Sequence, residues 1–226
     1  MKKILGLLVF LFISVTCRGA EFSVGYDSKY VSEGRDNLDR GGILWTTLNA
    51  DIDSHFSFQG AYGRATDSSV DYDELNLGMQ FADSVGEVDY YFGYTYLSFF
   101  EDDQDDHEIG FGFVWNSFGA FTPFLDYVHS TSASGSFLQL GIQTETKIGE
   151  ALIINPYLSV AYDFGYASES HDGHNHVALG ASLNYRIDDA FSMKLLLEQT
   201  FGGSDVRNEN GQNNQFWTGL HLNYSF

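Results

Sequence analysis

Charged side chains recur at alternate positions along several strongly patterned segments of this 226-residue chain. Nine residues of this polar face are candidates for lining a water-filled route: Asp27, Lys29, Glu108, Asp126, Lys147, Arg186, Lys194, Glu198 and His221. Such groups act electrostatically, because a ring of charged side chains selects ions by sign and an acidic ring favours cations. Their expected role is to set ion preference, with no bond-making chemistry.

Three imidazoles lie close together in the sequence, at His171, His174 and His176. Imidazole binds zinc, copper and nickel well, so this segment is a candidate metal site. Residues 101–108 are rich in Asp and Glu, which supply the oxygen ligands that Ca²⁺ and Mg²⁺ prefer. That segment lacks the Asp-x-Asp-x-Asp-Gly spacing of a calcium loop. The alternative for both segments is a solvated polar loop, and no cofactor is predicted.

A hydrolase is a third kind of chemistry to consider. Its candidate side chains are Ser130, His129, Asp126 and His176. A nucleophile needs a base within hydrogen-bond reach, and a third group must orient that base. His129 and Ser130 are adjacent, so on a strand they would point to opposite faces. No catalytic motif surrounds them, and the chain is therefore predicted not to be an enzyme.

The dominant pattern along the chain has a period of two residues. It is clearest in residues 74–81, 88–97, 176–187 and 216–226, where one set of alternate positions is apolar at 20 of 21 sites. The other set is apolar at only 4 of 20 sites. Alternate side chains leave a β-strand on opposite faces, so these segments are predicted to be strands with one apolar and one polar face.

The same pattern predicts twelve strands: 22–32, 42–52, 55–64, 71–82, 87–98, 107–116, 120–129, 136–148, 152–164, 175–187, 190–201 and 214–226. Their lengths are near the roughly 9–11 residues that cross a bilayer when tilted. The predicted fold is all-β: a transmembrane antiparallel barrel of about twelve strands, with short periplasmic turns and longer extracellular loops. The alternative is a secreted sandwich or a lipocalin-like barrel, with the apolar face as its core.

Residues 1–20 have the order of a secretion signal: Lys2 and Lys3, an apolar stretch, and a short polar exit. Residues 21–226 then form the barrel, and the predicted location is the bacterial outer membrane. Cys17 is the only cysteine and lies in the signal. Attachment of a lipid at Cys17 is the alternative, although the residues before it fit that kind of signal poorly.

The composition limits the partners. The chain has 31 Asp and Glu against 11 Lys and Arg, a formal net charge of −20. Nucleic acid is excluded because its phosphates require a basic face, and the sequence offers none. Aromatic residues gather toward the expected strand ends, as is typical of a membrane interface. The expected partners are outer-membrane lipid and lipopolysaccharide, small solutes or ions, and the outer-membrane assembly machinery, which would recognise the terminal Phe226.

The opening of the chain resembles that of the TorF-type porins. The stretch SVGYDSKYVSEGRDN, followed by GGILWTTLNADI, has the Ser-x-Tyr-Val-x-x-Gly pattern of their first strand at Ser28, Tyr30, Val31 and Gly34. The plan of a signal, Gly- and aromatic-rich strands and a terminal Phe is also similar. Lys29 stands where an acid is common, and Ser32-Glu33 replace an aromatic-Arg pair, with Arg35 displaced. The resemblance implies a porin-like barrel and no particular substrate.

The predicted function is a porin-like channel for passive diffusion of small hydrophilic solutes or ions, with a mild cation preference. Most acids of the polar face are expected in the outer half, and Lys147, Arg186 and Lys194 in the inner half. Inward glycines would either widen the bore or make room for the bulky Trp45, Tyr91, Tyr157 and Trp217. The alternatives are a sealed structural or surface-interaction barrel, in which opposite charges neutralise one another, and an outer-membrane hydrolase.

Overall fold

In the computed structural model, the described residues are 18–116, 119–168, 172–210 and 214–226. The predicted signal lies almost entirely outside them. The strands are β1 (Gly19–Asp27), β2 (Val31–Ser32), β3 (Arg35–Asp36), β4 (Gly42–Asp51), β5 (Phe56–Thr66), β6 (Asp73–Val85), β7 (Val88–Phe99), β8 (Gln104–Trp115), β9 (Thr122–Ser130), β10 (Gly135–Gln143), β11 (Thr146–Ile148), β12 (Leu152–Phe164), β13 (Asp172–Arg186), β14 (Phe191–Gly202) and β15 (Asn214–Ser225). The helix found within these residues is α2 (Ser204–Asn210). No helix in the described ranges is long and apolar enough to cross a membrane.

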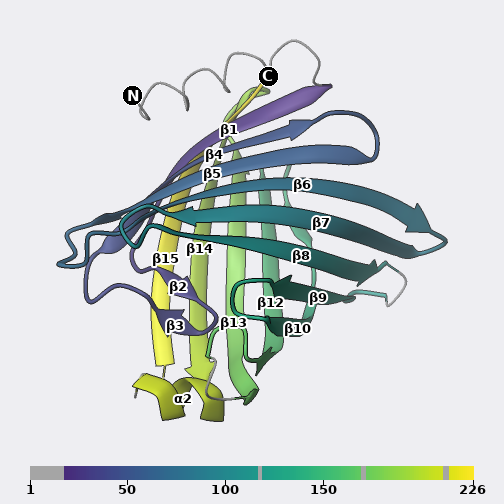
Figure 1. The fold of residues 1–226 in the computed structure, drawn as a ribbon. Helices are drawn as coiled ribbons and strands as arrows, with labels where there is room; N and C mark the ends of the chain where they lie inside the picture. The colour runs from purple at the N-terminus through teal and green to yellow at the C-terminus, as the bar shows by residue number, and fades with distance from the viewer. Residues whose placement is uncertain (1–17, 117–118, 169–171, 211–213) are drawn as a thin grey trace.

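Antiparallel pairing of neighbouring strands closes the sheet into a barrel (Figure 1). The first wall strand, β1, pairs with the last, β15, and β10 pairs with β9 and β12. Strands β10 and β11 together follow the predicted strand 136–148, and the prediction of a twelve-stranded barrel is confirmed. Phe226 completes the closure, since its backbone N and O bond the O and N of Ala20 at 2.8 and 2.9 Å. A closed sheet leaves no unpaired edge, as a barrel in lipid requires.

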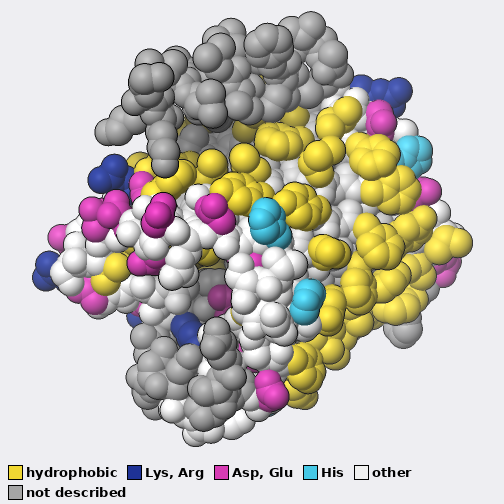
Figure 2. Space-filling view, in the orientation of Figure 1, with side chains coloured by type: hydrophobic (Ala, Val, Ile, Leu, Met, Phe, Trp, Pro, Cys, Tyr) yellow, Lys and Arg dark blue, Asp and Glu magenta, His cyan; other side chains and the backbone are white. Residues whose placement is uncertain are grey.

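The outward face of the wall is apolar, as predicted. Large side chains such as Phe92, Leu179 and Leu222 are each more than half exposed on it. Figure 2 shows hydrophobic side chains gathered in a broad band across one face of the molecule. Exposed apolar surface of this extent is unusual for a protein in water and suits contact with lipid.

The two ends of the barrel differ in their connections. At one end, here called the inner end, the turns are tight, such as residues 52–55, 86–87 and 187–190. At the other, here called the outer end, the connections include residues 28–41 and 203–210. The predicted asymmetry of short turns and longer loops is therefore present.

The first outer connection departs from the prediction. The predicted strand 22–32 ends at Asp27, and a separate hairpin, β2–β3, folds into the barrel (Figure 1). Its two-residue turn has positive φ at both Glu33 (47°) and Gly34 (73°), as in the type I′ turns that form tight hairpins. This turn reverses the chain, so the alternation of residues 28–32 belongs to a hairpin and not to the wall. Helix α2, in the last outer connection, is the second element that the pattern did not predict.

Candidate pore lumen

The barrel encloses a cavity of about 740 Å³. At its outer end the cavity is bounded by hairpin residues 31–34, and at its inner end it reaches Asn49, Asp51 and Ser57 near the turn between β4 and β5. Sites for small molecules commonly have volumes of about 300–1,000 Å³. The lumen therefore has room for a small hydrophilic solute.

Carboxylates dominate the charge of this cavity. Those that line it are Glu33 of the hairpin, Asp51 of β4, Glu108 of β8, Asp126 of β9 and Glu198 of β14. No Lys or Arg is among the lining residues, all of which lie in the described part of the chain. The potential inside is negative, and a narrow cavity with walls of low dielectric constant concentrates that field. Of the nine predicted pore residues, the structure brings Glu108, Asp126 and Glu198 to this wall.

Asp126 is held by a row of residues that crosses three neighbouring strands. Tyr91 of β7 lies directly opposite Gly112 of β8, which lies directly opposite Asp126 of β9. The Tyr91 hydroxyl donates a hydrogen bond of 2.8 Å to Asp126 Oδ1. A Cβ atom at position 112 would lie only 2.2 Å from the Tyr91 ring, so glycine is what lets the ring cross this strand.

Glu198 is held in the same way by a second row. Tyr157 of β12 lies opposite Gly180 of β13, which lies opposite Glu198 of β14. The Tyr157 hydroxyl donates to Glu198 Oε2, and Trp217 Nε1 of β15 donates to Glu198 Oε1 at 3.1 Å. A Cβ atom at position 180 would lie 2.3 Å from the Tyr157 ring. Both rows therefore fix a carboxylate with neutral aromatic donors.

Several of the inward glycines face aromatic or imidazole rings. Gly63 faces the Trp45 ring and Gly25 faces the His221 ring, at distances that would place a Cβ atom 2.5 and 2.0 Å from them. Gly25 and Gly63, like Gly112 and Gly180, therefore make room for rings that lie against the wall. They do not widen the bore at these positions, because the rings occupy the space. The atoms nearest to Gly78 and Gly93 belong to no ring, so those two glycines leave open space on the cavity wall.

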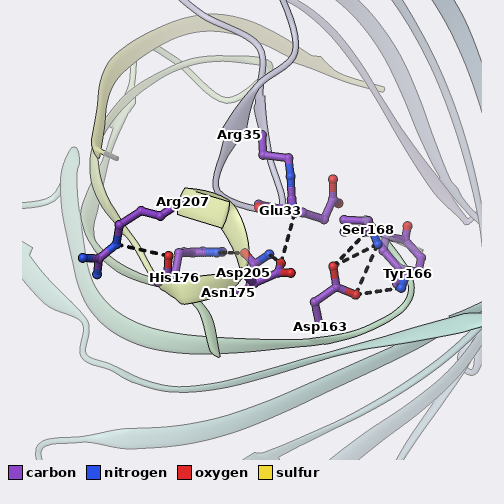
Figure 3. Close-up of polar contacts among 11 residues, drawn as sticks. Glu33, Arg35, Asp163, Tyr166, Ser168, Asn175, His176, Asp205 and Arg207 are labelled. Atoms are coloured by element: carbon purple, nitrogen blue, oxygen red, sulfur yellow. Dashed lines mark hydrogen bonds and ion pairs between the residues drawn. The ribbon is translucent and has the colours of Figure 1, made fainter. Parts of the chain in front are cut away.

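A buried ion pair fixes the hairpin at the outer end of the lumen (Figure 3). Arg35 Nη2 lies 3.0 Å from Asp205 Oδ2 of α2, and the two side chains are 7% and 0% exposed. Asn175 of β13 donates to the same oxygen at 2.7 Å. Breaking such a pair is costly, because it leaves an unpaired charge in the interior. Helix α2 therefore anchors the hairpin.

Glu33, at the tip of the hairpin, lines the cavity although the strand pattern did not single it out. Its positive φ is uncommon for a residue other than glycine. Burial raises the pKa of the Glu33 carboxyl above its ordinary 4.5, and the carboxylates of Glu74 and Asp163 raise it further. A hydrogen bond from Ser32 and the charge of Arg35 oppose this rise. Backbone strain and a perturbed pKa facing a cavity mark Glu33 as a candidate functional residue.

A second outer connection reaches the lumen from β12. The buried Asp163 accepts hydrogen bonds from the backbone N–H groups of residues 166–168, as Figure 3 shows in part. This tight turn directs the Tyr166 hydroxyl toward Glu108, where it donates to Oε1. Burial raises the pKa of Tyr166 well above its ordinary value, so the hydroxyl remains a donor. Glu108 thus resembles Asp126 and Glu198 in having a phenol as its partner.

Three of the predicted pore residues lie at the seam between β1 and β15, away from the cavity wall. His221 Nε2 is 2.9 Å from Asp27 Oδ1, and these side chains are largely buried. Lys29 lies just beyond β1, where its Nζ is 2.6 Å from Gln215 Oε1 and 3.5 Å from Asp36 Oδ2. These groups satisfy one another, as buried polar groups must.

The three predicted basic residues lie toward the inner end. Lys147 of β11 is exposed, with its Nζ 3.4 Å from Glu145 Oε1. Arg186 Nη2 donates to a backbone oxygen of an inner turn at 3.2 Å. Lys194 of β14 lies opposite His221 in the register with β15. None of the three is among the described residues that line the cavity, so the expected basic patch lies at the inner rim and leaves the cavity acidic.

The predicted imidazole site is not assembled by the described residues. A β-bulge in β13 shifts the register, so the two described histidines lie against opposite faces of the wall. The His174 ring contacts the exposed Tyr162 at 5.8 Å, whereas the His176 ring contacts Phe137, which lines the cavity, at 6.3 Å. His171 lies outside the described residues. Within those residues, which include the acidic outer loop, no three metal-binding side chains converge.

The strand arrangement matches several solved barrels. A KdgM porin in complex with disordered oligogalacturonate matches with a TM-score of 0.61 at 9% identity, over 92% of this chain and 99% of that one. A NanC porin matches with a TM-score of 0.56 at 10% identity, over 92% and 98%. LpxR from Salmonella typhimurium matches with a TM-score of 0.55 at 8% identity, over 90% and 99%. The fold is that of the outer-membrane porin barrels.

No family model matches this chain, and no curated protein matches it. The resemblance to the TorF-type porins therefore stays a prediction. At identities of 9% and 10%, the similarity to these porin barrels establishes the fold of this chain. It does not identify a solute, because one fold can serve many functions.

The positions of the candidate catalytic residues bear on the hydrolase alternative. Ser130 donates to Asp106 Oδ2 at 2.5 Å and does not meet the adjacent His129. His129 Nδ1 instead lies 3.0 Å from Ser136 Oγ, which is also 2.7 Å from the Tyr127 hydroxyl. Among the described residues, no carboxylate bonds His129 to orient it as a base. The predicted constellation is therefore not brought together.

Proposed function

We propose that this protein is an outer-membrane channel through which small hydrophilic solutes and ions diffuse passively, with a preference for cations. The observation that carries the proposal is the enclosed lumen, whose described lining has five carboxylates and no Lys or Arg. A negative pore raises the local concentration of cations and repels anions. The porin-barrel fold supports the same conclusion, because it holds this lumen across an apolar wall.

The test is single-channel conductance of the purified, folded protein in a planar bilayer with a KCl gradient. Discrete current steps are expected, with a reversal potential of the sign that K⁺ selectivity gives. Replacing Glu108, Asp126 and Glu198 together by Gln, Asn and Gln should move the reversal potential toward zero. A reversal potential of the opposite sign in the wild-type protein would reject the cation preference.

A sealed barrel is the second candidate function, because the hairpin and α2 stand at the outer end of the lumen. Such a barrel would act through its structure or its surface and would transport nothing. Silence in the bilayer from protein whose folding is proven by heat-modifiable mobility would support this candidate and reject the channel.

The apolar wall supports a location in the bacterial outer membrane, in contact with lipid and lipopolysaccharide. We propose that Phe226, which is 58% exposed beside the closing seam, is recognised by the assembly machinery. Deletion of Phe226 should then deplete folded, heat-modifiable barrel from the outer membrane. Normal amounts of folded barrel after the deletion would contradict this role.

A further inference from the structure

We infer that the solute of this channel is a small organic cation, an amine or guanidinium compound that binds in the lumen beside Asp126, Glu108 and Glu198. This inference rests on the proposed channel function and names the substrate class of the same lumen. Four features of the lumen support this inference. They are the carboxylate oxygens without a protein donor, the lack of counterions beside the carboxylates, the aromatic surfaces next to them, and the size of the cavity.

Two of the lumen carboxylates keep an oxygen atom without a protein donor. Asp126 receives its hydrogen bond at Oδ1 from Tyr91, and Glu108 receives its own at Oε1 from Tyr166. In the described part of the chain, no group donates a hydrogen bond to Asp126 Oδ2 or to Glu108 Oε2. Neither of these oxygen atoms is completely buried. These oxygens are therefore open to the lumen, where an N–H group of a cation can bond them.

The charges of these carboxylates are also left without counterions. Two other acids inside the barrel each face a basic side chain, since Asp27 faces His221 and Asp205 faces Arg35. In the described part of the chain, no ion pair forms at Asp126, Glu108 or Glu198. Neutral phenol and indole donors fix the side chains of Asp126 and Glu198 and supply no positive charge to them. A cationic solute supplies the missing positive charge and offsets part of the free-energy cost of removing the carboxylates from water.

Aromatic surfaces beside the acids favour an organic cation over a hydrated metal ion. The ring of Tyr91 lies against the wall at Gly112, which leaves its other face toward the lumen, and Trp217 lines the lumen next to Glu198. A cation over the face of a tyrosine or tryptophan ring is attracted by the quadrupole of the ring. The apolar part of an organic amine also packs on such rings, whereas a hydrated ion offers no apolar surface to them.

The volume of the lumen and the negative charge of its lining further limit the class of solute. About 740 Å³ bounded by the hairpin accepts a short chain-like molecule with one or two cationic ends. The KdgM porin that shares this fold was solved with oligogalacturonate, a chain of acidic sugars. Such an anion would meet several carboxylates and no Lys or Arg along the described lining here. The barrel is shared, and the solute of this lumen is expected to carry the opposite charge to that ligand.

The test compares three probes of equal length in the planar bilayer: butane-1,4-diamine, butane-1,4-diol and succinate. The diamine should block the K⁺ current at concentrations where the diol and succinate do not. Asp126→Asn should raise the blocking concentration of the diamine at least about tenfold, as expected for loss of a charge-assisted hydrogen bond. Asp89→Asn is the matched control, because Asp89 is an exposed acid near the inner end, bonded to Ser84 and Asn116 and outside the cavity.

The outcomes separate this inference from the channel itself. A channel that conducts K⁺ but is blocked equally by diamine and diol, or equally in the two variants, would overturn the organic-cation class and keep the channel. If folded protein conducts nothing, the fluorescence of the protein decides whether the lumen still binds the cation. Quenching by the diamine that is lost in Trp217→Phe would support the binding site, and unchanged fluorescence would overturn it.

Discussion

The outer plug, made of hairpin β2–β3, helix α2 and residues 165–168, differs from the lumen wall in how it holds its charges. In the plug, Arg35 and Asp205 form a buried ion pair, and the backbone N–H groups of residues 166–168 bond Asp163 of β12. In the wall, Asp126 and Glu198 are bonded by neutral aromatic side chains only. Both regions are acidic, yet Asp205 of the plug is paired with a buried cation, whereas Asp126 and Glu198 of the wall receive only neutral donors.

This difference separates charges that stabilise the protein from charges that are available to a solute. A charge that has a buried counterion helps to hold the plug in place. Such a charge is not accessible to a solute. A carboxylate that is positioned by a single hydroxyl group, as Asp126 is by Tyr91, keeps an oxygen to which a solute can bind. Substitutions that perturb either the plug or the lumen wall should therefore have different effects, and the largest is expected in the plug.

Arg35→Ala should release the hairpin from α2. Asp205 would stay fully buried without its cation, which commonly costs about 3–5 kcal/mol. We expect a higher single-channel conductance, because the hairpin bounds the lumen, and faster cleavage of residues 28–41 by proteinase K. The control is Lys29→Ala, which removes a partly exposed pair worth about 0–1 kcal/mol. Equal conductance and equal cleavage in both variants would show that the ion pair does not hold the plug.

Gly180→Ala should disturb the wall without touching the plug. The new Cβ atom would lie 2.3 Å from the Tyr157 ring, so the ring must swing into the lumen and give up its hydrogen bond to Glu198. Overpacking of this kind costs about 1–3 kcal/mol, and we expect a lower conductance. In Gly78→Ala, the nearest atom would be 3.6 Å away, and conductance should stay at the wild-type value.

A double variant tests the cause of that effect. If the displaced ring narrows the lumen, Tyr157→Ala combined with Gly180→Ala should restore the conductance that Gly180→Ala alone removes. The two substitutions would then be strongly non-additive, as expected for residues in direct contact. A double variant with the low conductance of Gly180→Ala would mean that the strand itself is distorted.

The wall could be predicted from the sequence, and the plug could not. Every wall strand faces lipid on one side and the lumen on the other, so local alternation reveals each strand and assigns Asp126 and Glu198 to the inside. The plug depends on contacts between distant segments, since Arg35 and Asp205 are 170 residues apart. A Glu33-Gly34 turn is the one local signal, and it is weaker than the Asn-Gly or Asp-Gly pairs that usually mark such hairpins.

The register rows show a second limit of sequence analysis. Alternation places Tyr157, Gly180 and Glu198 on the polar face but does not give their height along the barrel axis. The height of a residue follows from the register between neighbouring strands. That register depends on the turns and on the closing pair β1 and β15. For this reason the bases Lys147 and Arg186 could be assigned to the inner half but not separated from the cavity wall.

The smallest predicted effect concerns pH and the tip of the plug. Because the pKa of Glu33 is raised in the docked hairpin, the docked state binds more protons than a hairpin released into water. Docking is therefore strongest below the ordinary value of 4.5 and weakens as the pH rises through the raised pKa. We expect the channel to spend more time in its higher-conductance state as pH increases from about 4 to 8.

Glu33→Gln separates this tip carboxyl from the other acids of the barrel. The neutral amide imitates the protonated carboxyl, so this variant should remain in the lower-conductance state at neutral pH and lose most of the pH dependence. Glu101→Gln, in the exposed outer loop between β7 and β8, should behave as the wild-type protein does. If Glu33→Gln keeps the full pH dependence, the titrating group belongs to the lumen wall, and the plug would not be the element that responds to pH.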